Sequence, residues 1–410
     1  MPKQALLLCV FLFTLPGHVI AQEQAIPPNK ALAPKQALDP ALAIAQENAN
    51  TLSEAQRAYF FSRAYEKAAA LYRPLADQGD TFAQFNLGLM YELGQGVPQD
   101  HQQALKWYRL AAEKGDAAAQ FLQGLMYELG QDVPQDYQEA MRWYRLAAEH
   151  GDTTAQLMLG IMYDKGQGIV QDYQEAVKWF RRAAAHGNAD AQYFLGTMYS
   201  TGHGVPQDSS EAQKWERLAA EHGIAAAQLV LGLRYAMGQG VAQDHKAAVK
   251  WYRLAAEHGN AEAQFNLGLM YDTGQGVQQD YKEAAKWYRL AAEQGDVDGQ
   301  FSIGLMHDTG QGIRQDFNEA MKWYRLAAEQ GNAAAQLNLG LLYQSGHGVQ
   351  KDHVLAHMWA IISLANAADA EEKKKSNSLL KSSTRLMTPQ QIASAQELAH
   401  KCTANKFRGC

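Results

Sequence analysis

The chain has 410 residues, of which 47% are hydrophobic and 20% charged, a composition that fits a folded protein and excludes a largely disordered one. The 43 acidic residues outnumber the 37 basic ones and give a formal charge of −6, which argues against a nucleic-acid partner because such a partner favours a basic surface. The 34 glycines stand beside only 11 prolines, and this imbalance indicates many short, regularly placed turns.

The N-terminal residues form a separate segment. Lys3 supplies a positive charge, an apolar run follows from Ala5 to Phe13, and Ala21 ends a small-residue pattern typical of a cleavage site. The run is shorter than the roughly 20 apolar residues of a membrane span. We therefore predict a secretory signal peptide over residues 1–21, a periplasmic or secreted protein, and no membrane span after cleavage. The alternative is a short N-terminal membrane anchor.

Residues 22–50 differ from both neighbouring segments. Four prolines lie among Ala, Gln and Lys in this stretch, with no helical pattern that a capping residue would begin. Composition of this kind is typical of an extended linker. We predict a flexible spacer over residues 22–50.

Every tryptophan of the chain belongs to one series with a period of 36 residues and no insertion or deletion. The series is Trp107, Trp143, Trp179, Trp215, Trp251, Trp287, Trp323 and Trp359. A glycine and an aspartate recur in the same phase, beginning at Gly88 and Asp100. A fixed period of this length is the signature of a repeat architecture, in which neighbouring units cover the large rings that one unit cannot bury alone.

One unit, residues 80–115, predicts two helices. Ala83–Tyr91 has apolar or small residues at helical spacing, and turn residues interrupt it at Gly94–Pro98. Asp100 then has the character of an N-cap for a second helix, which Gly115 ends in a left-handed conformation. A Glu three residues after the aspartate recurs in five units, as at Glu139, and predicts a reciprocal capping box.

The consensus A-x-x-x-L-G-x-x-Y-x-x-G-x-G-V-x-x-D-x-x-x-A-x-x-W-Y-x-x-A-A-x-x-G resembles the Sel1-like repeat family, relatives of the tetratricopeptide repeats, in its exported bacterial form. We predict an all-α fold, a right-handed α-solenoid superhelix of eight helix-turn-helix units over residues 80–367. Residues 51–79 repeat the second-helix pattern without the G-x-G-V turn and predict an N-terminal capping half-repeat. Residues 368–410 predict C-terminal capping helices and a tail, with a helix start at Thr388 and Pro389.

Two cysteines, Cys402 and Cys410, lie in the predicted tail. In an oxidising compartment a disulfide between them would close a small loop. The alternative is a pair of unpaired thiols near the terminus.

Catalytic motifs are sparse. The sequence has no G-x-S-x-G, no H-E-x-x-H and no glycine-lysine phosphate loop. Ser378 and Lys381 match the S-x-x-K of serine β-lactamases, and the family resemblance implies a link to β-lactams through a cysteine-rich branch whose paired cysteines are missing here. We predict no enzyme and no cofactor, and keep a hydrolase or binder of β-lactams or cell-wall peptides as an alternative.

Histidines recur at one position in four consecutive units, at His150, His186, His222 and His258. Equivalent atoms of stacked units should lie about 10 Å apart, which is too far for one metal ion to bind two of them. We predict no metal site and interpret these residues as cations near helix C-termini. The glutamine at the second position of each first helix, from Gln84 to Gln336, predicts a structural row of hydrogen bonds.

A face of the first helices carries residues that vary between units, and six of its eight middle positions are Met, a side chain suited to adaptable contacts. The candidate groove residues are Leu122, Met126, Met158, Met162, Phe194, Met198, Val230 and Arg234. We predict that they line a concave groove that binds a peptide or helix of another protein. The alternative is that this row packs inside the solenoid.

We therefore predict a non-enzymatic scaffold for a protein or peptide of unknown identity. A glycan-binding solenoid is a further alternative, for which Tyr193 and Phe194 are the candidate aromatic residues. The unit at residues 188–223 departs most from the consensus, with Thr197 for Leu, Glu216 for an aromatic residue, and Ile224 where the next unit should begin with Asp or Asn. Such a defect indicates either a binding hot spot or a flexible joint.

Overall fold

A computed structural model of the chain describes residues 40–131 and 133–407. These residues form helices and turns, with no strand among them. At the N-terminal end stand α2 (Pro40–Gln56), the short π-helix η1 (Arg57–Phe61) and α3 (Tyr65–Asp77). No helix in the described ranges is both long and apolar enough to cross a membrane. The predicted signal peptide lies outside the described residues.

Eight pairs of helices follow α3. The first helices of the pairs are α4 (Thr81–Leu93), α6 (Ala117–Leu129), α8 (Thr153–Lys165), α10 (Ala189–Thr201), α12 (Ala225–Met237), α14 (Ala261–Thr273), α16 (Val297–Thr309) and α18 (Ala333–Ser345). The second helices are α5 (His101–Glu113), α7 (Tyr137–Glu149), α9 (Tyr173–Ala185), α11 (Ser209–Glu221), α13 (His245–Glu257), α15 (Tyr281–Glu293), α17 (Phe317–Glu329) and α19 (His353–Asn366). The chain ends with α20 (Ala370–Thr384) and α21 (Pro389–Ala404).

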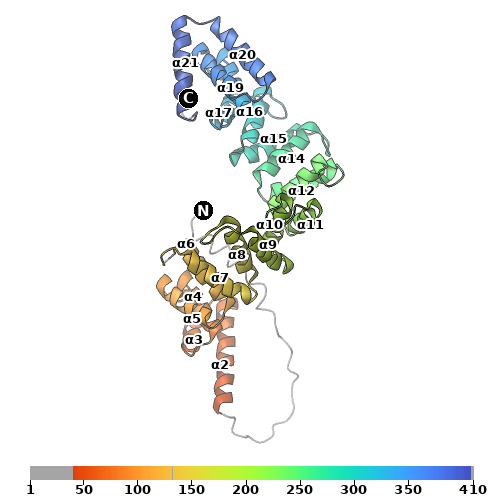
Figure 1. The fold of residues 1–410 in the computed structure, drawn as a ribbon. Coiled ribbons are helices and arrows are strands. Elements are labelled where there is room, and N and C mark those ends of the chain that lie inside the picture. The colour runs from red at the N-terminus through yellow and green to blue at the C-terminus, as the bar shows by residue number, and fades with distance from the viewer. Residues whose placement is uncertain (1–39, 132, 408–410) are drawn as a thin grey trace.

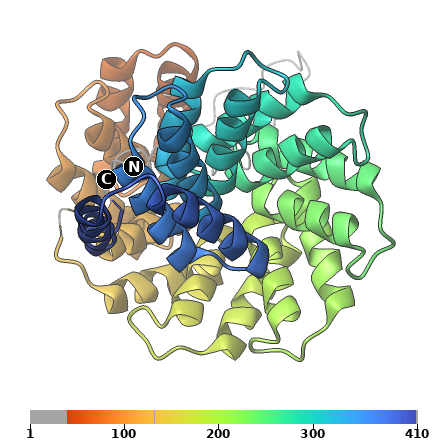
Figure 2. The same cartoon turned by 90° about the horizontal axis from the view of Figure 1, so that it is seen from above.

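The helix pairs stack into an elongated superhelix. From α3 to α20, each helix packs against its neighbours in the sequence, and α21 returns to pack on α19. Figure 1 shows the pairs rising from the N-terminal end to the C-terminal end. Seen from above in Figure 2, the path turns counter-clockwise while it rises towards the viewer, which is the sense of a right-handed superhelix. The predicted fold, an α-solenoid of repeated helix pairs, is confirmed.

The helix ends confirm the predicted caps. The Asp100 carboxylate accepts a hydrogen bond from the backbone N–H of Gln103 at 3.0 Å, and Gly115 adopts a φ of 92° after α5. The predicted capping box of the repeats is wrong. The backbone N–H of Asp136 already donates to the carbonyl of Tyr127 at 2.9 Å, so Glu139 pairs instead with Arg142 at 3.2 Å on the helix surface.

In six of the eight units, the centre is the aromatic residue that follows the tryptophan. Tyr144 is buried between α6 and α7, and a Cβ added at Gly124 would lie only 2.6 Å from its ring. The glycine therefore permits the close approach of this ring to the helix backbone. The indole rings of Trp107, Trp143 and Trp359 are buried, whereas the five others are only half-buried. The prediction that neighbouring units cover the tryptophan rings therefore holds in full for these three and only in part for the other five.

The two ends of the solenoid differ from the repeats. Residues 40–50 belong to α2, so the predicted spacer extends too far, because Pro40 suits a first helical position and good helix formers follow it. At the other end Thr388 and Gln391 form a complete capping box, which confirms the predicted start of α21. Cys402 on α21 is buried and disulfide-bonded. Its predicted partner Cys410 lies outside the described residues, so the identity of the pair stays a prediction.

Candidate partner-binding surface

The middle positions of the predicted groove lie in the core. Met126, Met162 and Met198 are buried, and so is Leu122. Their side chains fill the space between first and second helices, as the interior-packing alternative expects. In this arrangement they are not accessible to a partner.

The other predicted groove residues, Met158, Phe194, Val230 and Arg234, are half-buried. Phe194 stacks on Phe180 of the preceding unit, with ring centroids 5.2 Å apart and planes 9° from parallel. Its ring face is therefore engaged by the protein, which removes it from a glycan platform.

A row of exposed leucines on the first helices was not predicted. Leu269, Leu305 and Leu341 recur every 36 residues on α14, α16 and α18, with exposed fractions of 38%, 38% and 45%. Each follows the recurring glycine of its unit and has an apolar residue four positions earlier on the same face, as Phe265 precedes Leu269. We call these three residues the leucine row. The sequence signal was present, but a leucine at helical spacing is typical of a core position.

The second helices carry exposed leucines of a different kind. Leu290 and Leu326 have exposed fractions of 42% and 43%. Leu290 lies among Lys286, Arg289 and Glu293 on its helix, so it does not join an apolar strip. Single exposed leucines of this kind are ordinary on protein surfaces.

A cavity of about 340 Å³ lies where α10, α11 and α12 meet. Tyr193 and Thr197 of α10, Glu216 of α11, and Arg234 and Met237 of α12 are among the residues that line it. Four of these residues were singled out from the sequence, and the fold brings them together. Thr197 and Glu216 depart from the consensus, Tyr193 is a candidate aromatic residue for glycan binding, and Arg234 is a candidate groove residue.

An ion pair forms the floor of this cavity. Nε of Arg234 donates to one Glu216 carboxylate oxygen at 2.7 Å and Nη2 donates to the other at 2.9 Å. The two side chains are only 13% and 5% exposed, respectively. A buried bidentate pair of this geometry fixes both side chains, because either charge alone would be costly to bury.

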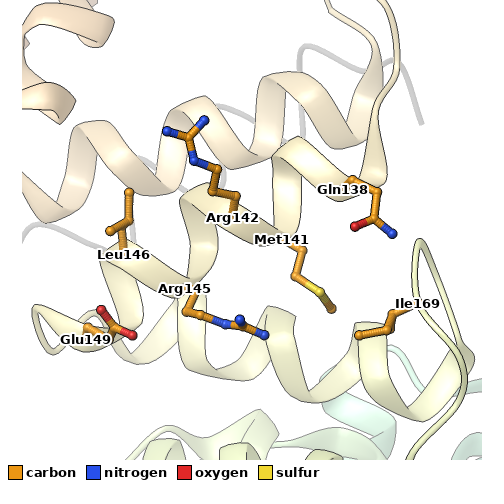
Figure 3. Close-up of a pocket in the computed structure, with 7 residues that line it drawn as sticks. All are labelled: Gln138, Met141, Arg142, Arg145, Leu146, Glu149 and Ile169. Carbon is orange, nitrogen blue, oxygen red and sulfur yellow. The ribbon is translucent and has the colours of Figure 1, made fainter.

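A second cavity, of about 430 Å³, runs along α7 (Figure 3). Arg142, Arg145 and Glu149 of α7 line it together with Ile169 from the turn of the next unit. Arg142 pairs with Glu139, and Nη2 of Arg145 donates to the Tyr163 hydroxyl at 2.9 Å. The same Arg–Tyr contact recurs in most units, so this cavity belongs to the frame of the repeat.

The glutamine row is structural, as predicted. Nε2 of Gln120 donates to the carbonyl of Ala112 at 3.0 Å, and all eight equivalents make the same bond. The Nδ1 atom of His150 lies 2.8 Å from the Gln120 side-chain oxygen, and His222 and His258 repeat this contact. Each of these histidines therefore contacts the glutamine of its own unit, and that glutamine bonds in turn to the preceding unit. Within the described ranges no cluster of His, Cys, Asp and Glu could hold a metal ion.

The β-lactamase-like motif does not form a site. Ser378 and Lys381 both lie on the exposed side of α20. A nucleophile of this class needs a base and an oxyanion site gathered around it in a protected pocket. Neither cavity described above includes these residues.

The stacked helix pairs and their repeated surface define a helical repeat protein, a class that in general presents a scaffold for protein interaction and does not carry out catalysis. The Sel1 repeat profile matches this chain at residues 60–80, 81–116, 117–152, 153–188, 189–224, 225–260, 261–296, 297–332 and 333–365. The chain belongs to the Sel1 repeat family.

Two solved structures are similar over most of their lengths. One is a protective antigen of uropathogenic Escherichia coli strains with an SLR fold, which is 30% identical, has a TM-score of 0.56, and covers 89% of this chain and 86% of its own. The other is a Sel1 repeat protein from Oxalobacter formigenes, which is 34% identical, has a TM-score of 0.55, and covers 75% of this chain and 89% of its own. A comparison with curated proteins found no match.

Proposed function

We propose that this protein is an exported, non-enzymatic scaffold that binds a peptide or helix of a partner protein along its first helices. The observation that carries the proposal is the leucine row, because three apolar side chains on consecutive units stay exposed although the solenoid buries most others. Rows of apolar anchors at a fixed spacing suit an amphipathic helix or an extended peptide.

The position of the row favours a protein ligand over a small molecule. Consecutive units place equivalent leucines side by side along the superhelix, so the surface is long and shallow. Small-molecule sites are enclosed and offer a few convergent polar groups. A surface of this shape is typical of the extended binding faces of solenoids.

A matched pair of variants tests this proposal. Leu269→Asp with Leu305→Asp places charges in the leucine row, and Leu290→Asp with Leu326→Asp places the same charges at equally exposed sites on the second helices. Purified proteins spanning residues 22–410 would be used to capture partners from a bacterial envelope extract. We expect the first pair to lose the captured protein and the second pair to retain it. Equal capture by both pairs would contradict the assignment of the surface.

The export part of the proposal has its own test. The sequence predicts cleavage after Ala21, so expression of the whole chain in a Gram-negative host should give a periplasmic or secreted product that begins at Gln22. Intact mass and N-terminal sequencing would check this outcome. A product that retains residues 1–21 in the membrane fraction would support the anchor alternative instead.

A further inference from the structure

Six residues at the junction of the fourth and fifth units differ from what most other units carry at the same positions. They are Thr197, Ser200, Ser209, Glu216, Ile224 and Arg234. The seven other units have Leu or Ile in place of Thr197, a ring-bearing residue in place of Ser209, and Met or Leu in place of Arg234. Four of the six, namely Thr197, Ser200, Glu216 and Arg234, line the single cavity between α10, α11 and α12.

The first consequence concerns the charges. Both Glu216 oxygens accept from Arg234, and Glu216 is the more deeply buried of the two. The guanidinium uses Nε and Nη2 for this pair, which leaves the Nη1 donors directed elsewhere. The cavity therefore presents spare N–H donors and a covered carboxylate.

The second consequence concerns access. In other units the glycine of the turn is packed against the start of the preceding second helix; a Cβ at Gly204 or Gly276 would lie 2.2 Å from backbone oxygen there. At Gly240 the only atom within 4 Å of such a Cβ is Nη1 of Arg234, at 3.8 Å. Ser209 stands where the other units have a ring-bearing residue, and none of its atoms lies within 4 Å of the Cβ position at Gly240. Met237–Gly240 is exposed throughout.

The third consequence concerns the walls. Tyr193, Val230, Leu233 and Met237 supply an aromatic and apolar lining beside the guanidinium, and Met237 is 54% exposed at the rim. A flexible Met suits contact with side chains of differing shape. The site therefore combines a planar cationic donor with an apolar neighbour.

We propose that this cavity binds a carboxylate of the partner peptide on Nη1 of Arg234, with an apolar side chain of the peptide against Met237. Guanidinium N–H groups recognise carboxylates by charge-assisted hydrogen bonds. A doubly charged phosphate fits less well, because Glu216 already neutralises the site and the whole chain carries −6. This inference rests on the proposed function, since it names the chemistry of the ligand that the scaffold takes.

Three synthetic peptides test the inference on the protein spanning residues 22–410. They are acetyl-Ala-Ala-Leu with a free carboxyl terminus, the same peptide as its amide, and acetyl-Ala-Asp-Leu amide. Titrations followed by calorimetry or ligand-observed NMR give the three affinities. We expect at least tenfold tighter binding of one acidic peptide than of the neutral amide, and the identity of that peptide distinguishes a chain terminus from an acidic side chain. Equal affinities, or no binding of any peptide, would overturn the inference.

Two variants locate the site. Glu216→Tyr with Arg234→Met introduces the residues that most other units have and removes the guanidinium. Ser209→Tyr introduces a ring at the start of α11 but keeps the ion pair. Both should melt close to the wild type and lose the preference for the acidic peptide. Retention of that preference in both variants would place the carboxylate elsewhere.

The result of the peptide titrations can be distinguished from the result of the partner-capture experiment. If the peptides fail but partner capture still depends on the leucine row, the scaffold stands without this carboxylate site. If the peptides bind as expected but the leucine-row variants lose nothing, the docking surface is wrong and the junction cavity stands alone.

Discussion

At the residue scale, the packing of six of the eight units depends on the contact between the glycine of the first helix and the ring that follows the tryptophan. Where that ring is a tyrosine, its burial against the glycine leaves few hydrogen-bond partners within reach of the hydroxyl. The Tyr144 hydroxyl donates to the Glu128 carboxylate at 2.6 Å, and Tyr324 makes a similar bond to Asp308 at 3.2 Å. Burial and the adjacent carboxylates raise the pKa of both phenols well above the usual value, so they stay protonated donors.

Two matched substitutions measure what this hydroxyl contributes. Tyr144→Phe removes the bond to Glu128 and should lower the free energy of unfolding by about 1 kcal/mol. Tyr108→Phe removes a buried hydroxyl that has no hydrogen-bond partner among the described residues, so it should be neutral or slightly stabilising. Urea denaturation of both variants would check the difference. Equal losses would contradict the roles given to the two hydroxyls.

His307 stands where most other units have a Tyr that accepts from an arginine. Nη2 of Arg289 lies 3.2 Å from Nε2 of His307, a contact that needs the unprotonated ring nitrogen. Burial, followed by the charge of Arg289, lowers the pKa of His307, while Asp316 and Glu319 act in the opposite direction. Because the unfolded state then binds protons more readily, stability falls as the pH drops below the usual histidine pKa of about 6.5.

His307→Tyr should therefore reduce the acid sensitivity of the protein. Between about pH 7.5 and pH 5 the wild type should lose on the order of 1 kcal/mol more than the variant, which corresponds to one hydrogen bond. Melting temperatures measured across that range would check this expectation. Parallel curves for the two proteins would show that His307 titrates alike in the folded and unfolded states.

At the element scale, the sequence predicted the helices well because their ends are chemically marked. Asp and Asn caps and left-handed glycines lie at nearly every boundary, and each acts through atoms within a few residues of itself. The capping box failed because the required N–H is taken by the carbonyl of the preceding helix, a contact that spans the turn. The exposure of a side chain could not be predicted from the local sequence either. Leu125 and Leu305 are the same residue type at the same position of the repeat, and only the packing around them buries one and exposes the other.

The pairing of α11 with α12 gives a prediction at the same scale. Arg234→Met alone leaves Glu216 buried without its partner and should cost about 3–5 kcal/mol. Glu216→Tyr alone leaves the guanidinium unpaired and should also be strongly destabilising. The double variant introduces the Tyr and Met that most other units have, and its free energy of unfolding should lie within about 1 kcal/mol of that of the wild type. A double-mutant cycle measures the coupling, and additive single effects would contradict a joint role.

At the scale of the whole molecule, the buried apolar residues do not form one unbroken core. One large cluster extends as far as Met198, and the next begins at Leu229. Between them the structure has only a small cluster of Ala219, Ala220, Ala227 and Leu231. A solenoid is stabilised by contacts between neighbouring units. A weak junction therefore lowers the cooperativity of unfolding between the units that precede it and those that follow it.

Hydrogen exchange should reveal this junction. Helices α11 and α12 are stabilised by fewer buried apolar contacts than α15, so local opening should expose their amides first. We expect their amide hydrogens to exchange at least tenfold faster than those of α15. Mass spectrometry of peptides from the labelled intact protein gives the exchange rates of the three helices. The variant Glu216→Tyr with Arg234→Met is the control, because it makes the apolar core continuous. In this variant the difference in exchange rate should become smaller. Equal protection of α11 and α15 in the wild type would contradict this expectation. It would mean that the ion pair stabilises the contact between α11 and α12 as much as a buried aromatic ring stabilises the other units. The junction would then be a rigid recognition site and not a flexible joint.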